Sequence, residues 1–333
     1  MTKCKKNQSL DSFEQHFAYL QDQLLNKQLE ISKRFKGVAA CCSGGPDSTA
    51  LFHLLRQMTK AKKNFPLVIC HVNFGLRGEE SNQDERFLRA LSDEFQAPIF
   101  VRNVKKNQDP RSRSKNLQNW ARQIRYDFFK ELISEGYIIA LGHTENDVAE
   151  NAIFRMARGA SPLSLAGMNM WTPPYWRPLL KTPKSFVMRW LDKFELSYRE
   201  DSSNQKTIYT RNIIRHKILP KLEQRHPGAT HRIARLAEET EQLTKYIIQQ
   251  KFEKIHRAEQ IQRSEITEFP YIICKLFIAD FIRRKTSPKQ RLSSIVINEI
   301  CKRIKDQKTK VWKIQLNKHA YLHLKNDTIE IKP

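Results

Sequence analysis

A chain of 333 residues is long enough for two domains, each with a hydrophobic core of its own. Lys and Arg number 59 against 35 Asp and Glu, which gives a formal net charge of +24, and residues 202–333 hold 28 of the basic but only 13 of the acidic side chains. This excess is typical of proteins that bind phosphate backbones, and also of lysine-rich solubilising surfaces. Six cysteines without a C-x-x-C pair argue against a zinc ribbon, an iron–sulfur site and a disulfide framework.

Targeting and membrane signals are missing from the sequence. The first 15 residues contain no apolar signal-peptide core, and the most apolar later stretch, residues 271–282, is interrupted by Lys275 and Asp280. We therefore expect a cytoplasmic protein without a membrane partner. The sequence does not distinguish a monomer from a homodimer.

In the first half of the chain, short apolar runs alternate with helical patterns. A helical repeat over residues 13–24 opens the chain. Strands are then predicted at 37–42, 67–72, 98–104 and 137–141, and helices at 49–58, 117–132 and 145–158. Strands alternating with helices predict an α/β fold with a doubly wound parallel sheet, in which ligands bind outside the carboxyl ends of the strands.

The pattern changes after Pro183. Helices are predicted at 186–194, 211–225, 230–257 and 268–284, and the alternation over 311–331 predicts a short β hairpin or meander. We therefore expect two domains, an α/β domain over residues 1–210 and a smaller, basic, mainly helical domain over residues 211–333 that ends in a short β segment.

A turn-rich segment between the first predicted strand and the next helix has the character of a phosphate-binding loop. Its residues are Ser43, Gly44, Gly45, Pro46, Asp47 and Ser48. Glycines let backbone amides approach a ligand, a proline suits the first helical turn, and the amides at a helix start attract anions. A carboxylate fits such a site through a bridging Mg²⁺. In the alternative reading Asp47 and Ser48 only cap a helix, which does not account for the strand–loop–helix order.

This loop resembles the SGGxDS loop of the N-type ATP pyrophosphatases of the PP-loop superfamily, which cleave ATP between the α and β phosphates. Further stretches resemble the tRNA(Ile)-lysidine synthetases: HVNFGLRGEES (71–81), ARQIRY (121–126), GHTENDVAE (142–150), RPLL (177–180), EDSSN (200–204) and RNIIR (211–215). The resemblance covers about residues 35–225. It implies an adenine nucleotide alpha-hydrolase-like fold, with ATP and Mg²⁺ bound at residues 43–48 and Asp47 on the metal.

The same resemblance implies a reaction and its partners. The wobble cytidine of a tRNA(Ile) with a CAU anticodon would be adenylated by ATP, and the ε-amine of L-lysine would then replace AMP to form lysidine. Residues 1–210 would be the catalytic domain, and residues 211–333 would bind the tRNA.

Site roles follow from residue chemistry and from the matched motifs. Arg77 is expected to reach phosphate from its glycine-flanked loop, and a solvated surface role is the alternative. The expected catalytic residues are Asp47, Arg122, Arg125, His143 and Asp147. Capping of its helix is the alternative role for Asp147, because Thr144-x-x-Asp147 is a capping pattern, and the two roles can share the carboxylate. Glu150 is expected to bind the amine of lysine, and Arg211 and Arg215 the tRNA backbone.

Three positions depart from the family pattern. Phe74 and Thr144 stand where the family has histidines, and Asn146 stands where it has an aspartate. Three rival readings stay open. A tRNA thiolase would use the same adenylation with a sulfur donor, a small-molecule ligase would give no reason for the basic C-terminal part, and a non-catalytic RNA-binding protein would carry a degenerate loop.

Overall fold

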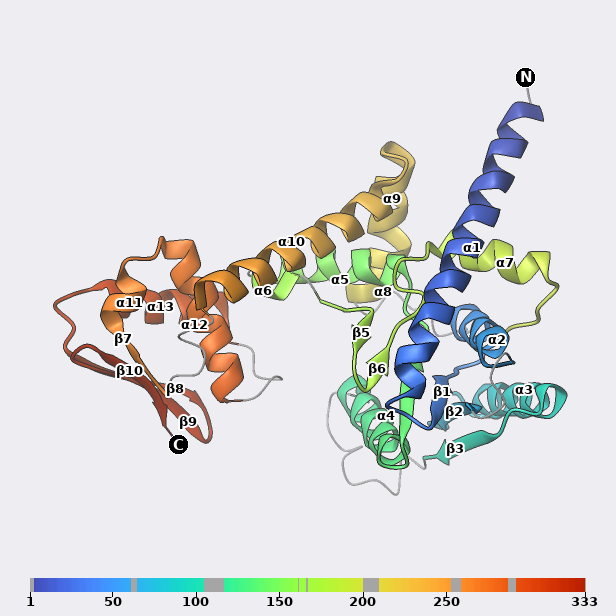
Figure 1. Cartoon of the computed structure of the whole chain (residues 1–333), viewed down its shortest axis with the longest axis horizontal. Coiled ribbons are helices and arrows are strands. Elements are labelled where there is room, and N and C mark those ends of the chain that lie inside the picture. Colours follow the sequence, from blue (N-terminus) through green and yellow to red (C-terminus); the bar gives the residue numbers. More distant parts are fainter. Residues whose placement is uncertain are drawn as a thin grey trace. The chain divides into compact units, whose positions relative to one another are not determined.

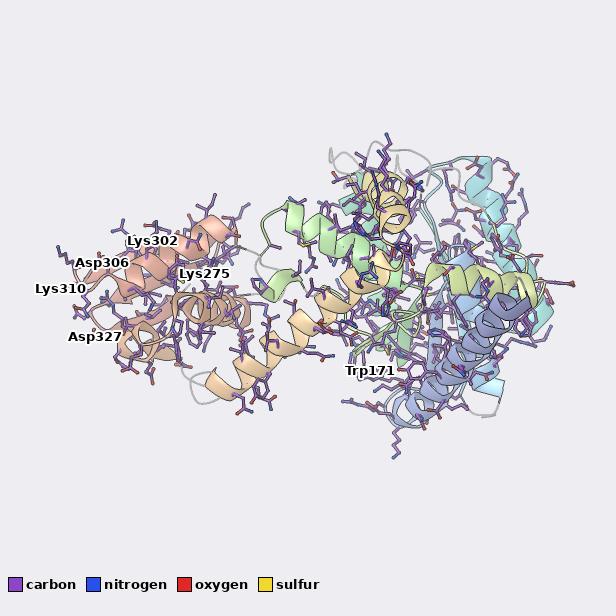
Figure 2. The ribbon with its side chains drawn as sticks, turned by 90° about the horizontal axis from the view of Figure 1, so that it is seen from above. Trp171, Lys275, Lys302, Asp306, Lys310 and Asp327 are labelled. Carbon is purple, nitrogen blue, oxygen red and sulfur yellow. The ribbon has the colours of Figure 1, made fainter. Side chains whose placement is uncertain are left out.

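The computed structural model describes residues 3–60, 65–104, 117–160, 162–165, 167–199, 210–252, 259–286 and 292–332 (Figure 1; Figure 2). The chain forms two compact units. The first comprises Met1–Val148 and Met168–Asn212, and the second comprises Ala149–Gly167 and Ile213–Pro333. The sequence places a domain boundary after residue 210; in the structure the chain enters the second unit at residue 213, and the segment Ala149–Gly167 belongs to that unit as well.

The first unit is an α/β structure. Its strands are β1 (Gly37–Cys41), β2 (Leu67–Asn73), β3 (Ile99–Asn103), β4 (Tyr137–Leu141), β5 (Trp171–Thr172) and β6 (Tyr175–Trp176). Its helices are α1 (Lys3–Ser32), α2 (Pro46–Lys60), α3 (Glu79–Phe95), α4 (Leu117–Ser134), α7 (Lys184–Lys193), α8 (Thr210–Ile213) and the first turn of α5 (Glu145–Ala157).

The strands form one sheet in the order β3-β2-β1-β4-β6-β5, in which only β5 is antiparallel to its neighbour. The chain thus leaves β1 for β2 and β3 on one side and returns to β4 on the other side. In parallel sheets this reversal opens a crevice at the carboxyl ends of the two central strands. The loops that follow β1 and β4 both begin at that crevice.

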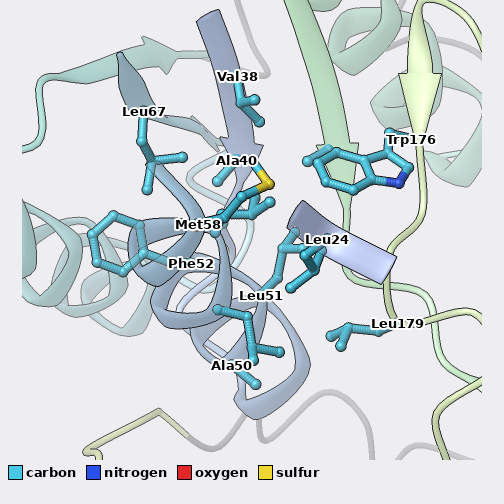
Figure 3. Packing of buried hydrophobic residues seen from close by; sticks show 14 of the residues in the cluster. Leu24, Val38, Ala40, Ala50, Leu51, Phe52, Met58, Leu67, Trp176 and Leu179 are labelled. Atoms are coloured by element: carbon cyan, nitrogen blue, oxygen red, sulfur yellow. The ribbon is translucent and has the colours of Figure 1, made fainter. Parts of the chain in front are cut away.

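Alternating side chains along the strands supply two cores. Val38 and Ala40 of β1 face α1, α2 and α7, in the packing that Figure 3 shows around Phe52 and Trp176. Ala39 faces the opposite side, where Phe128 and Phe129 of α4 cover the sheet. Because both faces are covered, the central strands are apolar throughout, as expected for a parallel sheet.

The second unit has its own core of helices against a small antiparallel sheet. Its helices are the remainder of α5, α6 (Pro162–Leu165), the π-helical turn Ile214–Ile218, α9 (Leu219–Arg225), α10 (Ala229–Phe252), α11 (Arg263–Thr267), α12 (Tyr271–Lys285) and α13 (Ser294–Lys305). Its sheet has the order β7-β10-β9-β8, from β7 (Gln260–Gln262), β10 (Thr328–Lys332), β9 (Ala320–Lys325) and β8 (Val311–Asn317). Ile278, Ile300 and Leu322 are fully buried where α12, α13 and the sheet meet.

The fold class predicted from the sequence is confirmed, a doubly wound parallel sheet with a mainly helical C-terminal part. Elements that the sequence did not predict are α3, α13, the short helices α6 and α11, the two-residue strands β5 and β6, and the short β7. Among the described residues, no helix combines the length and the apolar character that crossing a bilayer requires.

Candidate nucleotide site

The segment between β1 and α2 folds into a compact loop closed by its own side chains. The Ser43 N–H donates to Ser48 Oγ at 3.1 Å, and Ser48 Oγ donates to the Gly45 carbonyl at 2.9 Å. Gly44 has φ of +88°, a conformation that glycine adopts without steric strain. Pro46 is the first residue of α2, so the positive end of this helix points into the loop, as an anion site requires.

The loop after β4 comes very close to the phosphate loop. A Cβ atom added to Gly142 would lie 3.0 Å from the Asp47 carbonyl oxygen and 3.3 Å from the Ser48 nitrogen. Any side chain at Gly142 would therefore push the start of α2 away. The two loops of the crevice therefore pack directly against each other.

Asp47 forms an ion pair that the sequence did not indicate. Its Oδ1 lies 2.5 Å from Lys184 Nζ, at the start of α7. Asn146 Oδ1 accepts a hydrogen bond from the Lys184 backbone N–H at 2.9 Å, so one of the three departures from the family pattern fixes the start of that helix. A cation thus already occupies the carboxylate that the sequence assigns to Mg²⁺.

Among the described residues, a magnesium ion fits beside the phosphate loop with Asp47 as its protein ligand. No group of three or more His, Cys, Asp or Glu side chains that could hold a metal is present among them. Asp47, about one-third exposed in the first turn of α2, can supply a single carboxylate beside a phosphate loop. Mg²⁺ in nucleotide sites typically has one or two carboxylates, with phosphate oxygens and water completing its shell.

Arg77 follows β2 and is held by acidic partners. Its Nη2 lies 2.6 Å from Oδ2 of Asp84, a buried residue of α3, and Arg199 Nε lies 3.4 Å from Oδ1 of the same carboxylate. The Arg199 backbone N–H also donates to the Gly44 carbonyl at 2.8 Å. Asp84 therefore links Arg77 to the phosphate loop through Arg199, and neither Asp84 nor Arg199 was predicted as a site residue.

His143 and Asp147 lie at the junction of β4 and α5. Asp147 Oδ2 accepts hydrogen bonds from the Thr144 backbone N–H at 2.8 Å and from Thr144 Oγ1 at 3.2 Å. The capping role considered from the sequence is thus present in the structure. It does not exclude a second role, because one carboxylate can cap a helix and also contact a substrate.

Arginines surround His143. Burial lowers the pKa of His143 to about 4; the carboxylate of Asp147 opposes this shift, while Arg177, Arg125 and Arg211 add to it. The imidazole is therefore neutral at neutral pH, and it can donate or accept hydrogen bonds without adding charge. Arg177, from the RPLL motif, was not predicted as a site residue.

Arg125 connects the ends of three neighbouring strands. Its charge acts on Cys41 in β1, on His71 in β2 and on His143 after β4. Its guanidinium also lies 5.8 Å from the ring centroid of Phe74, which packs against Trp120. Phe74 thus forms an aromatic wall beside Arg125.

Unsatisfied polar atoms collect in the same place. Six buried side-chain nitrogen or oxygen atoms of the described residues have no hydrogen-bond partner, and four of them belong to His71, Trp120, His143 and Arg177. Buried polar groups are normally paired, so these four atoms are available to hydrogen-bond a ligand or water. Arg177 lies close to Arg122, and burial and the Arg122 charge lower the pKa of its guanidinium. Such a pair of like charges favours binding of an anion.

The neutral state of His143 predicts a pH dependence of stability. A histidine whose folded pKa is about 4, below its usual 6.5, stabilises the folded state fully above pH 6.5 and loses this contribution as the pH falls towards 4. We expect wild-type protein to lose more stability between pH 7 and pH 5 than a His143→Gln variant does. Urea unfolding of both proteins at the two pH values measures this; an equal loss would contradict it.

Two of the predicted substrate-binding residues pair with each other in the second unit. Arg215 Nε and Nη2 donate to the two carboxylate oxygens of Glu150 at 2.6 and 2.9 Å, and Glu150 is buried. Arg211 lies in the first unit and is exposed. Arg122, also exposed, donates to the Tyr126 hydroxyl at 3.1 Å. The EDSSN motif, residues 200–204, lies outside the described residues.

In the first unit, then, the structure groups the phosphate loop, Asp47, Arg125, His143 and Asp147 around the crevice of the sheet. Comparison with known proteins gives this arrangement a family. A family model described as a PP-loop domain matches residues 13–222. A tRNA(Ile)-lysidine synthase of Rhodopirellula baltica is 38% identical over 215 residues, which are 58% of this chain and 54% of that protein.

Other relatives agree with this match. A tRNA(Ile)-lysidine synthase of Bacillus cereus is 30% identical over 237 residues, 69% of this chain and 50% of that protein. The chain spans about half the length of these curated relatives. A solved structure, the U34-tRNA thiolase NcsA from Methanococcus maripaludis with its [4Fe-4S] cluster, superposes with a TM-score of 0.55. The match covers 69% of this chain and 79% of the thiolase chain at 22% identity, which shows a similarity of fold. Because the PP-loop domain model matches more than half of its residues, the chain belongs to the PP-loop family, whose members bind and use ATP.

Proposed function

We propose that the protein is a tRNA(Ile)-lysidine synthase, which adenylates the wobble cytidine of a tRNA(Ile) with a CAU anticodon and attaches L-lysine to it. The observation that carries the proposal is the grouping of Asp47, Arg125, His143 and Asp147 around one phosphate loop. Curated relatives of 30–38% identity bear the same name. The proposal places the reaction at the carboxyl edge of the first sheet, in the cytoplasm.

In the first step the C2 carbonyl oxygen of cytidine attacks the α phosphorus of ATP, and pyrophosphate leaves. The Gly44 backbone amide and the positive end of α2 bind the departing phosphates. The N–H groups of Ser43 and Gly45 and the Ser48 hydroxyl join them by exchanging their hydrogen bonds within the loop for bonds to phosphate oxygens. Mg²⁺ bound by Asp47 would neutralise phosphate charge there. Arg125 and Arg122 stabilise the negative charge that develops at the α phosphate.

In the second step the ε-amine of lysine forms a bond to C2, and the C2–O bond to AMP breaks. The amine must lose a proton to attack, and Asp147 is the group that accepts it. Neutral His143 orients the cytosine base by a hydrogen bond, for which its unpaired Nδ1 is suited. Glu150 binds the amine of lysine, which requires the ammonium ion to compete with Arg215 for its carboxylate.

Basic side chains hold the tRNA in this proposal. Arg211, at the end of the first unit, and Arg215, in the second unit, contact the tRNA backbone. Residues 202–333 supply the general attraction, because they hold 28 basic and only 13 acidic side chains. The alternative to a lysidine synthase is a tRNA thiolase of the same PP-loop superfamily. Among the described residues no cluster suited to a metal or iron–sulfur group is present, and the sequence has no C-x-x-C pair.

One experiment separates the proposed function from its rivals. Purified protein is incubated with tRNA(Ile), ATP, Mg²⁺ and isotopically labelled lysine, and the tRNA nucleosides are separated by mass spectrometry. We expect lysine-dependent formation of lysidine with one AMP per product. Sulfur incorporation with a sulfide donor would instead indicate a thiolase, and tRNA binding without ATP turnover would indicate a non-catalytic RNA-binding protein.

A further inference from the structure

The ion pair between Asp47 and Lys184 joins segments 137 residues apart. The two side chains are each about one-third exposed, so the pair lies at the surface of the crevice and not in the core. Exposed pairs of this kind contribute about 0–1 kcal/mol to stability. The pair is therefore a weak stabilising device, although its Nζ–Oδ1 distance of 2.5 Å is short.

Two hydrogen bonds fix the backbone around Lys184. Asn146 Oδ1 accepts from the Lys184 N–H at 2.9 Å, and the Thr182 carbonyl accepts from the Glu145 N–H at 3.0 Å. These bonds connect the start of α5 with the start of α7, directly beside the phosphate loop. The lysine stem, with four rotatable bonds, is thus attached to a fixed point.

The electrostatic setting of the ammonium group is unfavourable without an anion. Lys184 Nζ lies beside the first turn of α2, where the helix carries its positive end. Cations are stabilised at the opposite end of a helix, and the carboxylate of Asp47 compensates for this position. A polyphosphate bound to the amides of α2 would bring several negative oxygens to the same place.

We propose that Lys184 exchanges partners when the nucleotide binds. Without nucleotide its ammonium group neutralises Asp47; with nucleotide it binds phosphate oxygens, and Asp47 becomes available to the metal. Lys184 is then a phosphate-binding residue, and the ion pair keeps Asp47 from holding a divalent cation before the polyphosphate arrives. This inference deepens the proposed function and rests on the site assigned there.

The exchange predicts binding changes of opposite sign for a Lys184→Gln variant. Without its competitor, Asp47 should bind Mn²⁺, used as a probe for Mg²⁺, several-fold more tightly in the absence of nucleotide. Inorganic tripolyphosphate without metal should bind about tenfold more weakly, because a charge-assisted contact is lost. Electron paramagnetic resonance measures the free Mn²⁺, and calorimetry measures tripolyphosphate binding.

Matched variants show whether the effect belongs to this lysine. Lys193→Gln removes the same charge from the exposed last turn of α7 and should leave both affinities unchanged. Lys184→Arg keeps a cation and should retain tripolyphosphate binding. In a double variant, Asp47→Asn with Lys184→Gln, the gain in Mn²⁺ affinity should disappear. Should Lys184→Gln fail to fold, Lys184→Met provides the same two measurements with a side chain of similar length.

The inference is overturned if Lys184→Gln changes neither the Mn²⁺ affinity nor the tripolyphosphate affinity, or weakens both. Loss of a purely structural lysine would give one of these two results. Both measurements use inorganic ligands and no tRNA. A protein that shows the exchange but makes no lysidine would therefore refute the proposed function and leave the exchange standing. A protein that makes lysidine without the exchange would do the reverse.

Discussion

An Asp47→Asn variant is expected to form AMP from ATP at least ~10²-fold more slowly than the wild-type protein, the order of effect seen when a charge-stabilising group is removed from a transition state. The amide keeps the size of the side chain and removes the negative charge that Lys184 contacts. Without that carboxylate, nothing else in the first turn of α2 offers an anionic oxygen to a metal. Release of AMP from labelled ATP, in the presence of tRNA(Ile) and lysine, measures the loss.

The control is Asp192→Asn, which removes an equal charge from an exposed position of α7. Its AMP formation should match that of the wild type within a factor of two, about the limit of such assays. If Asp47→Asn keeps more than a tenth of the wild-type rate across a range of Mg²⁺ concentrations, Asp47 does not hold the metal. The site would then have to bind nucleotide through amides and arginines alone.

An Arg263→Ala variant is expected to destabilise the second unit by about 4 kcal/mol, among the larger effects of single substitutions. The guanidinium is buried, and its Nε and Nη1 donate to the carbonyls of Ile304 and Thr309 at 2.6 and 2.7 Å. Its Nη2 also donates to the carbonyls of Arg303 and Asp306. Removing the guanidinium takes this donor from the Arg303 and Ile304 carbonyls in the last turn of α13, and Ile304 is buried, which makes the loss costly.

Unfolding of the two units must be followed separately. Hydrogen exchange of β9 amides reports the second unit, and that of β4 amides reports the first. Only β9 should lose protection in Arg263→Ala. The control is Lys302→Ala, at an exposed position of α13 that Figure 2 labels. It should change the free energy of unfolding by less than ~0.5 kcal/mol. A loss below about 1 kcal/mol for Arg263→Ala would show that water replaces the guanidinium.

Local sequence patterns predicted the elements that build the sheet, because each central strand is a short apolar run and each covering helix repeats its apolar residues. The sequence pattern did not predict helix α3, because its buried face includes Ser81, Asp84 and Ser92, which weaken the apolar periodicity. Helix α13 does carry that periodicity, in Ile297, Ile300, Cys301 and Ile304. The two-residue strands β5 and β6 are too short for any periodic signal.

The site was predictable where chemistry is concentrated in one loop and not where it depends on contacts between distant segments. The loop of residues 43–48 and the capping pattern of Asp147 were visible in the sequence. The pairing of Lys184 with Asp47, the pairing of Arg199 with Asp84 and the buried Nε of Arg177 without a partner were not visible. No local pattern states which distant side chain lies opposite a given residue. Asn146 shows the same limit: its contact is with a backbone amide 38 residues away.

The strand order of the first unit also bears on how this protein becomes active. Since β1 pairs with β2 on one side and with β4 on the other, the crevice is complete only after strands far apart in sequence have aligned in parallel. Such non-local pairing forms late and slowly during folding. In a nascent or truncated chain the glycine-rich loop can therefore be present long before Lys184 and Arg199 lie beside it. High-affinity binding of a nucleotide would then report that the whole unit has folded.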